Sequence, residues 1–461
     1  MVNLAAYYRI LHHGLLLVDN VADVATPQQA SKEQYNIINF LGGSGPYKQA
    51  KGFGIDPNPP DQCTVDHIQL VSRHGERFPS KGDGVRFEAI WNIISQYKKD
   101  HGPLKGDLSV FNNYNYFVNN KDYYEKETDR DNAQSPYLGL DDAYLHGQVF
   151  RKKYGHLIPK NQKFPVFSSN SDRCFHTGET FTQAFLDTDD LSNVDFVVIA
   201  ENSTYGANSL TPRLACNVDG ENHDAIKKYD LSYQDRIIQR WQRDNPGLNL
   251  TGSQTASMML WCGFEINVKG WGPTCDLFTT EEWIRNQYRG DVGNYYQIGR
   301  GNKVGRVVGS QMAKASFKLL NDTTAANQVY LSFTHDTDVE FMLTSLNIVD
   351  PKEDIPVDHV PFPNPYSAAE IVPMGTRLYI ERLNCSNEHY VRFVLNDAVV
   401  PIPSCQNGPG FSCKLSDYAN YLNSQVGDVD FNRDCNATGP NELTFYWDYT
   451  SVTYDAPLID Q

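Results

Sequence analysis

One stretch decides the fold: Ile68-Gln69-Leu70-Val71-Ser72-Arg73-His74-Gly75-Glu76-Arg77-Phe78-Pro79. Its apolar first half predicts the end of a buried strand, and the glycine and the proline predict that a turn follows. The polar group between them then lies at the carboxyl edge of the strand. Open α/β sheets bind their ligands at this edge, so the stretch predicts both the fold class and the place of the site.

The polar group combines an imidazole, His74, with two guanidinium groups, Arg73 and Arg77. Like charges held this close raise the free energy unless an anion joins them, and the planar guanidinium forks match the oxygens of a phosphate. Repulsion from the arginines should also make His74 harder to protonate, which leaves a lone pair for attack on phosphorus. The stretch therefore predicts a phosphate site with a nucleophilic histidine.

The pattern Arg-His-Gly-x-Arg-x-Pro has five specified positions, and a chance match in a chain of this length has odds on the order of 1 in 10⁴. The competing interpretation is two surface arginines beside a capping histidine. The pattern resembles the signature of the histidine acid phosphatases. The upstream segment Phe40-Leu41-Gly42-Gly43-Ser44-Gly45-Pro46-Tyr47 narrows the resemblance to the secreted acid phosphatases and phytases of yeasts.

Two further predicted strands end in polar residues. The segment 166–173 is predicted to be a short strand that ends near Arg173, and the apolar segment 329–334 runs directly into His335 and Asp336. On spacing alone, the arginine could bridge surface carboxylates and the His-Asp pair could cap a helix. In the family that the chain resembles, they match a further phosphate-binding arginine and the second motif. Parallel strands would place this second motif beside the first.

The resemblance implies a role for each of these residues in the hydrolysis of phosphate esters. His74 is the expected nucleophile, which forms a phosphohistidine, and Asp336 is the expected proton donor to the leaving oxygen. Because an unperturbed aspartate ionises near pH ~4, a neutral Asp336 requires an acidic working range or a raised pKa. The expected phosphate-binding residues are Arg73, Arg77, Arg173 and His335.

The chain has 461 residues and a formal net charge of −16, with 40% hydrophobic and 21% charged residues. This composition is typical of a soluble globular protein and argues against disorder. The negative surface would repel nucleic acid and anionic membranes, so an anionic substrate needs a local basic pocket. The expected partner is a small anionic phosphate ester, with neither nucleic acid nor membrane. Assembly into a homo-oligomer is left open.

We expect neither a cofactor nor a metal. The sequence has no His-x-x-x-His or paired Cys-x-x-Cys spacing of the kind that holds metal ions. Zinc held by His74, His335 and Asp336 is the alternative, but the adjacent arginines would repel a cation.

Nine cysteines and five Asn-x-Ser/Thr sequons together predict secretion, to the extracellular, cell-wall or periplasmic space. The candidate glycosylation sites are Asn202, Asn249, Asn321, Asn384 and Asn436. Four disulfides with one cysteine left over is the simplest count, and the sequence itself leaves the pairing open. The family resemblance implies the pairs Cys63–Cys385, Cys216–Cys435, Cys262–Cys275 and Cys405–Cys413, with Cys174 free.

The expected fold is α/β: a mixed, largely parallel sheet flanked by helices, similar to phosphoglycerate mutase, with a second, smaller all-α lobe built from insertions. The α/β domain is assigned residues 36–82, 160–220 and 301–461, and the helical lobe residues 83–159 and 221–300. Residues 101–136 show no clear periodicity and are predicted to be a surface insertion. Residues 1–35 are predicted to be an N-terminal extension.

The sequence says least about the choice of substrate. Phytate, myo-inositol hexakisphosphate, is a compact polyanion, and Lys81 and Arg86 just after the motif are candidates for binding it. Both residues are equally compatible with solvated surface charges. The leading hypothesis is a secreted phytase, and its close alternative is a broad-specificity acid phosphatase. More remote alternatives are a phosphoglycerate-mutase-like phosphoryl transferase and a noncatalytic phosphate-binding or cell-wall protein.

Overall fold

The computed structural model describes residues 36–160 and 162–460, so the predicted extension, residues 1–35, lies outside the described part. The core of the protein is an eight-stranded sheet with the order β3-β2-β4-β1-β5-β6-β7, in which β8 pairs with β6. The strands are β1 (Cys63–Arg73), β2 (Phe164–Ser169), β3 (Val194–Ile199), β4 (Val329–Thr334), β5 (Arg377–Cys385), β6 (Glu388–Leu395), β7 (Ala398–Val400) and β8 (Cys413–Lys414).

The strands that precede the predicted site residues pair in parallel. β4 lies between β1 and β2, and β2 also pairs with β3. The strands from β5 onward add an antiparallel part on the other side of β1. β2 and β4 are buried along their whole length, as expected for strands covered on both faces. The predicted mixed α/β fold is confirmed.

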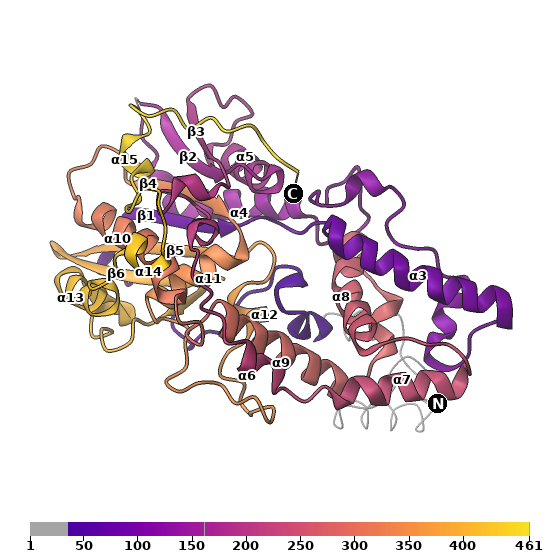
Figure 1. Ribbon diagram of the computed structural model, residues 1–461. Coiled ribbons are helices and arrows are strands. Elements are labelled where there is room, and N and C mark those ends of the chain that lie inside the picture. The colour runs from indigo at the N-terminus through magenta and orange to yellow at the C-terminus, as the bar shows by residue number, and fades with distance from the viewer. Residues whose placement is uncertain (1–35, 161, 461) are drawn as a thin grey trace, which may run out of the picture.

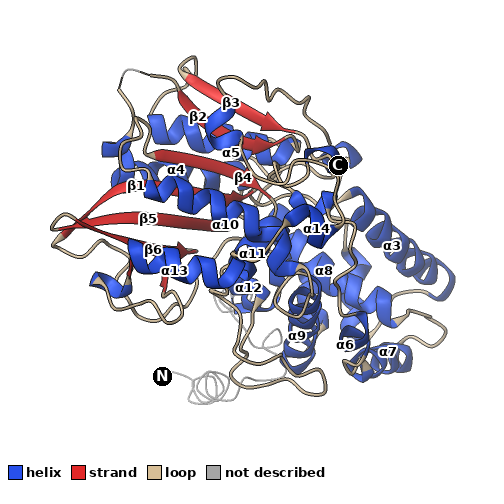
Figure 2. Ribbon diagram, turned by 60° about the vertical axis from the view of Figure 1, so that its left-hand side comes forward, coloured by secondary structure: helices blue, strands red, loops and turns tan. Residues whose placement is uncertain are grey.

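Helices cover both faces of this sheet (Figures 1 and 2). The longer ones are α3 (Lys81–His101), α4 (Gly139–Tyr154), α5 (Asp172–Leu186), α7 (Ser232–Asp244), α8 (Gly252–Lys269), α9 (Thr280–Gln297), α10 (Gly305–Asn321), α11 (Asp336–Ser345) and α13 (Leu415–Val426). The short ones are α6 (His223–Lys227), α12 (Ala368–Ile371), α14 (Phe431–Cys435) and α15 (Phe445–Asp448). Several 3₁₀ turns join them, among them η3 (Gly42–Ser44) and η4 (Gly106–Asn113).

The two faces of the sheet have separate apolar layers. On one face, Phe150 of α4 and Phe181 of α5 form a cluster with Leu70 and Phe333 of the central strands. On the other face, Tyr418 of α13 packs on Phe393 of β6, next to α10. The hydrophobic side chains of the sheet are therefore removed from water on both sides, and the carboxyl ends of its parallel strands stay free for polar groups.

Helices α3, α7, α8 and α9 lie to one side of the sheet and pack on one another (Figure 1). Both α8 and α9 begin with a capping box, in which Thr251 pairs with Gln254 and Thr279 with Glu282. These reciprocal bonds satisfy backbone groups that the first turn of a helix leaves unpaired, which explains where the two helices start.

The prediction that residues 101–136 form a surface insertion is wrong for much of the segment. Leu108, Phe111 and Phe117 are buried, and the two phenylalanine rings contact Trp261 of α8. The apolar residues follow no regular period because most of the segment is irregular loop and 3₁₀ turn, so periodicity could not reveal their burial.

The prediction that residues 83–159 belong to the helical lobe stays a prediction, and the packing of its second half favours a shorter lobe segment. Helix α4 lies against the sheet and α5: Nη1 of Arg151 donates to the carbonyl of Phe185 at 2.7 Å, and the hydroxyl of Tyr154 donates to Glu381 of β5 at 2.6 Å. We therefore propose that the lobe segment ends before Gly139. The other predicted boundaries stay predictions.

Four disulfides join the pairs that the family resemblance implies, Cys63–Cys385, Cys216–Cys435, Cys262–Cys275 and Cys405–Cys413. The first of them links β1 to β5, and Cys174 is free and buried. Within the described ranges, no helix combines the length and the apolar character that a bilayer crossing requires.

Helix α4 also contacts the first motif, and this close approach gives a test of the fold. A Cβ on Gly139 would overlap the backbone of Glu76, and a Cβ on Gly75 would overlap the backbone of Gly139. We expect Gly139→Ala to lower the free energy of unfolding by about 1–3 kcal/mol, because the overpacked backbones must separate. Denaturant unfolding measures the change.

Gly293→Ala in α9 is the matched control, since its nearest contact would be a side-chain atom of Gln297 at 3.9 Å. Alanine favours a helix over glycine, so this variant should be as stable as the parent or slightly more stable. Equal destabilisation by the two substitutions would contradict the close approach of α4 to the motif.

Candidate active site

The pairing of β1 with β4 brings the two motifs together. Arg73 is in register with Thr334, and the backbone N–H of His74 donates to the carbonyl of Thr334 at 3.1 Å. The rings of His74 and His335 are consequently 5.8 Å apart between centroids. β2 pairs with the other edge of β4, and this places Arg173, at the start of α5, on the same edge of the sheet.

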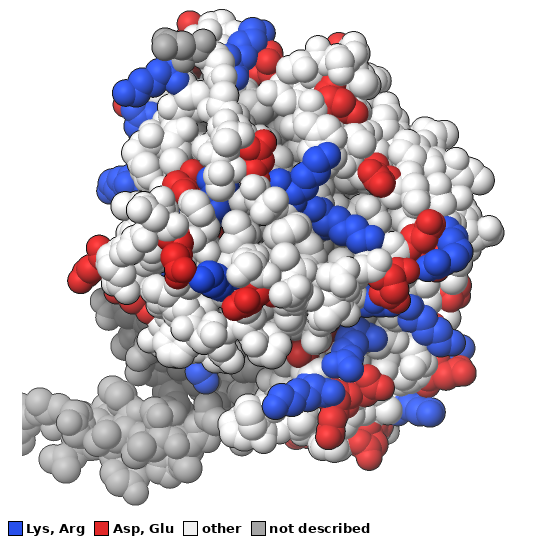
Figure 3. All heavy atoms as spheres, turned by 90° about the vertical axis from the view of Figure 1, so that its left-hand side faces the viewer, with Lys and Arg blue, Asp and Glu red and all other residues white. Residues whose placement is uncertain are grey.

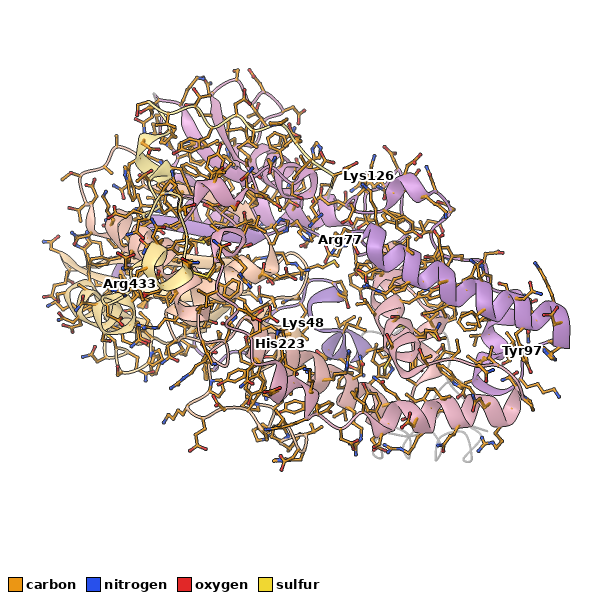
Figure 4. All side chains as sticks on the ribbon, viewed as in Figure 1. Lys48, Arg77, Tyr97, Lys126, His223 and Arg433 are labelled. Carbon is orange, nitrogen blue, oxygen red and sulfur yellow. A yellow bond between two sulfur atoms is a disulfide. The ribbon has the colours of Figure 1, made fainter. Side chains whose placement is uncertain are left out.

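A cavity of about 280 Å³ opens at this edge. Every residue predicted to be catalytic or to bind the phosphate lines it: Arg73, His74, Arg77, Arg173, His335 and Asp336. Arg77 lies where the chain passes from the sheet into α3 (Figure 4). The sequence motifs, which are far apart along the chain, therefore share one site.

His74 is buried, and its Nδ1 lies 2.9 Å from the carbonyl oxygen of Gly75. A carbonyl only accepts hydrogen bonds, so Nδ1 carries the proton and the lone pair of a neutral ring is on Nε2. Burial lowers the pKa of His74 well below its ordinary value, and the charges of Arg173, Arg73 and Arg77 lower it further. The sequence hypothesis named the arginines, whereas burial is the larger cause.

Two backbone carbonyls and one carboxylate hold Arg73. Its Nη1 donates to Gly43 at 2.6 Å and to Val372 at 2.7 Å, and its Nη2 lies 3.0 Å from Oδ2 of Asp336. Nη1 of Arg77 donates to the carbonyl of Phe78 at 2.8 Å. The Nε atoms of these two arginines are buried and have no hydrogen-bond partner among the described residues. Both guanidinium groups are fixed yet can still donate to an anion.

His335 is held as a cation. Its Nε2 lies 2.6 Å from Oε1 of Glu201, and its Nδ1 lies 3.5 Å from Nη2 of Arg173. Burial lowers the pKa of His335, but the interactions with Cys174 and Glu201 outweigh this effect and raise the pKa to about 10. Two positively charged donors 3.5 Å apart repel each other, so an anion that accepts from both would stabilise the pair.

Asp336 is the first residue of α11, and Oδ1 accepts a hydrogen bond from the backbone N–H of Thr337 at 3.0 Å. Its side chain is 34% exposed and faces the cavity. Desolvation raises the pKa of Asp336, but the charges of Arg73 and His335 outweigh it and hold the pKa below its ordinary value. The surrounding protein groups therefore lower the pKa of this carboxyl group, which favours the expectation of an acidic working range.

The structure adds residues that the sequence did not single out. Glu201 follows β3 and lines the cavity, and Glu125 holds Arg173, with its carboxylate 3.3 Å from Nη1. Arg213 also lines the cavity. The position of Glu201 just beyond a buried strand was a signal of the same kind as that of His335. Glu125 comes from an irregular segment and Arg213 from a short 3₁₀ helix, η8 (Pro212–Ala215), and neither position shows such a pattern.

Lys81 and Arg86, the two candidates for substrate specificity, do not line this cavity. Lys81 is the exposed first residue of α3, and its backbone N–H donates to Glu125. Arg86 is exposed, pairs with Asp83 and lines a different cavity. Across the described ranges, no cluster of three or more His, Cys, Asp and Glu side chains could hold a metal ion.

Known proteins are similar to this chain in sequence and in fold over nearly its whole length. The family model described as histidine phosphatase superfamily (branch 2) matches residues 64–396. Phytase PHO112 of Candida albicans is 49% identical over 457 residues, 98% of each chain, and acid phosphatase PHO11 of Saccharomyces cerevisiae is 39% identical over 440 residues, 93% of each. The crystal structure of the phytase from D. castellii is 45% identical with a TM-score of 0.91, and the match covers 97% of this chain and 98% of that one.

The chain belongs to the histidine phosphatase superfamily (branch 2), which confirms the family resemblance. It is an enzyme, a phosphoric monoester hydrolase of the acid phosphatase and phytase group.

The contact between Glu201 and His335 generates a prediction about charge. Glu201→Gln keeps the size of the side chain but removes the charge that stabilises the protonated ring, so the pKa of His335 should fall from about 10. The contact stabilises the folded protein while the ring is protonated, and this stabilisation is lost as the pH rises through the folded-state pKa. In the variant, the stabilisation that depends on the protonated His335 ring should therefore be lost at a lower pH than in the parent.

An NMR titration of the His335 ring measures this pKa. Glu179→Gln is the control, because Glu179 contacts the exposed His176 and lies outside the cavity. If His335 titrates identically in the parent and in Glu201→Gln, the carboxylate does not hold the ring as a cation.

Proposed function

We propose that this enzyme releases phosphate from phosphate monoesters through a phosphohistidine on His74, with myo-inositol hexakisphosphate as its principal substrate. One observation carries the proposal: a buried, neutral His74 shares a single cavity with four arginines, a cationic His335 and the carboxyl group of Asp336. The hydrolysis of a phosphate ester needs charge neutralisation, attack and protonation together, and the cavity offers a group for each.

In the first step, the lone pair on Nε2 of His74 attacks phosphorus in line with the ester bond. The N–P bond forms as the P–O bond breaks, and Asp336 gives its proton to the departing oxygen. Arg73, Arg77, Arg173 and His335 bind the three phosphoryl oxygens and stabilise the charge that these oxygens carry in the transition state.

In the second step, water attacks the phosphohistidine. The carboxylate of Asp336 takes a proton from the water, the N–P bond breaks, and its electron pair returns to Nε2 of His74. The products are inorganic phosphate and an enzyme in its starting protonation state. His74 can accept and release the phosphoryl group because the hydrogen bond of Nδ1 to Gly75 keeps the ring in one orientation and one tautomer.

An acidic working range follows from the electrostatics of Asp336. The Arg73 ion pair favours the ionised carboxylate, whereas the first step needs the protonated acid. A phosphate bound by Arg73 competes with Asp336 for that arginine, and its negative charge raises the pKa of the carboxyl group. Activity should therefore be highest in acid and decline as the pH rises through the pKa of Asp336 in the substrate complex.

A broad-specificity acid phosphatase is the second candidate, because the same cavity would serve any phosphate monoester. The similar proteins include both phytases and acid phosphatases, at 49% and 39% identity. The similarity to a phytase whose structure superimposes over 97% of this chain favours phytate as the substrate. Comparing the turnover of phytate with that of an aryl phosphate separates the two candidates, and a strong preference for the aryl ester would contradict the phytase.

We also propose that the protein is secreted and glycosylated. Four disulfides suit an oxidising compartment. The sequon residues Asn202, Asn249, Asn321 and Asn436 are exposed, and Asn384 is half-buried. A protein from its native source whose mass does not change on treatment with an endoglycosidase would contradict the glycosylation.

The nucleophile can be tested by substitution and trapping. His74→Ala should lose at least about 10³-fold in kcat, because no other group in the cavity is placed to form the covalent intermediate. A phosphatase assay measures the loss, and mapping of radioactive phosphopeptides after an alkaline quench locates the label in the parent enzyme. The control is His176→Ala on the exposed face of α5, which should retain activity. Label on a residue other than His74 would refute the mechanism.

The proton donor can be tested with leaving groups of different basicity. Asp336→Asn cannot donate the proton, so hydrolysis of an alkyl phosphate should slow by about 10²–10⁴-fold. Hydrolysis of p-nitrophenyl phosphate should slow much less, because its leaving group departs as a stable anion. Steady-state kinetics on the two esters measure the difference, and an equal loss on both esters would assign Asp336 a role other than protonation.

A further inference from the structure

The peptide bond that follows His74 is held from both sides. Its carbonyl, on His74, accepts a hydrogen bond from the backbone N–H of Gly375 at 2.9 Å. Its N–H, on Gly75, donates to the hydroxyl oxygen of Thr177 at 3.0 Å. The first contact joins two backbone groups, whereas the second depends on one side chain of α5. Thr177 therefore supplies the part of this pair of contacts that a substitution can remove.

Gly75 is the flexible point of the turn. Glycine has more conformational freedom than any other residue, and a Cβ here would overlap the backbone of Gly139. The carbonyl of the same glycine accepts the hydrogen bond from Nδ1 of His74. A rotation of the backbone at Gly75 would move this carbonyl and release the ring from the tautomer whose lone pair is on Nε2. The contact of the Gly75 N–H with Thr177 opposes this rotation.

Glu127 orients the hydroxyl group of Thr177. The hydroxyl has one proton and donates it to Oε1 of Glu127, so its lone pairs are left for the N–H of Gly75. Acidic side chains lie at the surface on the face that Figure 3 shows, but Glu127 is only 6% exposed. Burial raises the pKa of Glu127 well above its ordinary value. A neutral carboxyl group still accepts through its carbonyl oxygen, so the contact persists in acid.

The backbone around Glu127 pairs with the first motif. Glu127 and Arg77 form an antiparallel bridge, and the backbone N–H of Thr128 donates to the carbonyl of Glu76 at 2.9 Å. The carboxyl group that accepts from Thr177 is therefore held by the same turn that carries the nucleophile.

We propose that Thr177, oriented by Glu127, is a positioning residue for the nucleophile: it holds the N–H of Gly75, so that the carbonyl of Gly75 keeps the His74 ring in its reactive tautomer and orientation. The inference rests on the proposed function, in which His74 forms the phosphohistidine. Thr177 does not line the catalytic cavity, so it acts through Gly75 and does not touch the substrate. Loss of its hydroxyl group should slow the attack on phosphorus and leave the binding of phosphate unchanged.

Two pairs of variants isolate the hydroxyl group. Thr177→Val replaces it with a methyl group of similar size, and Thr177→Ala differs from Thr177→Ser by the hydroxyl alone. In Thr177→Val and Thr177→Ala, kcat for phenyl phosphate should fall about 10- to 100-fold, because a displaced nucleophile attacks from a poorer geometry. Thr177→Ser should recover most of kcat. The inhibition constant of inorganic phosphate should stay within about threefold of the parent value in every variant, since the arginines that bind phosphate are unaltered.

Thr182→Val is the matched control on the same helix. Thr182 is also buried, but its hydroxyl donates to the carbonyl of Gly178 within α5 at 2.6 Å. This variant should keep the kcat of the parent. Denaturant unfolding shows that kcat is compared among folded proteins. If Thr177→Val does not fold, the comparison of Thr177→Ser with Thr177→Ala measures the effect of the same hydroxyl group.

A spectroscopic measurement does not depend on turnover. In enzyme that contains isotope-labelled histidine, the ring nitrogen resonances of His74 are identified by their loss in His74→Ala. They should report the Nδ1–H tautomer in the parent and in Thr177→Ser, and a mixture of the two tautomers in Thr177→Val and Thr177→Ala. A phosphoryl label on a residue other than His74 would refute the proposed function, while the resonances still test the positioning of the ring.

Four results would overturn the positioning role of Thr177. They are an unchanged kcat or an unchanged tautomer in the variants that lack the hydroxyl group, an equal loss of kcat in Thr182→Val, an inhibition constant of phosphate that rises in step with the loss of kcat, and a failure of Thr177→Ser to recover activity.

Discussion

The parallel pairing of β1 with β4 is the constraint on which the site depends. It sets Arg73 opposite Thr334, so that His74 and His335 leave the sheet side by side. Side chains alternate between the two faces of a strand, and a shift of one residue in this register would turn one motif away from the other. The same pairing places Asp336 at the start of α11 and in contact with Arg73. Packing of the sheet thus determines the relative positions of nucleophile and acid.

Three cationic side chains of the site each contact a carboxylate, whereas His74 contacts a backbone carbonyl. Arg73 contacts Asp336, Arg173 contacts Glu125, and His335 contacts Glu201. These carboxylates reduce the cost of holding several cations in one buried place. His74 bonds instead to the carbonyl of Gly75, so it has nothing to offset burial and the repulsion of the arginines. The contacts of His335 with Cys174 and Glu201, which have no counterpart at His74, therefore decide which imidazole is charged and which is neutral.

The sequence predicted the parallel strands and the residues at their ends, because apolar runs that stop at polar motifs are local signals. It did not predict Glu125 or Glu201, whose importance depends on which cation each one meets in space. Two further features also depend on tertiary packing, which leaves no local signal in the sequence. They are the burial of Leu108 and Phe111 in an aperiodic segment and the packing of α4 on the sheet.

The place of β1 within the sheet has a consequence for the newly made chain. Its two neighbours, β4 and β5, follow it only after the helices of the lobe have been synthesised. Until then, this apolar strand has no partner on either edge, the condition under which unpaired strands recruit other chains. The nascent polypeptide therefore exposes an unpaired apolar strand for most of its translation. A ribosome that stops short of β4 would release a product with no partial catalytic competence.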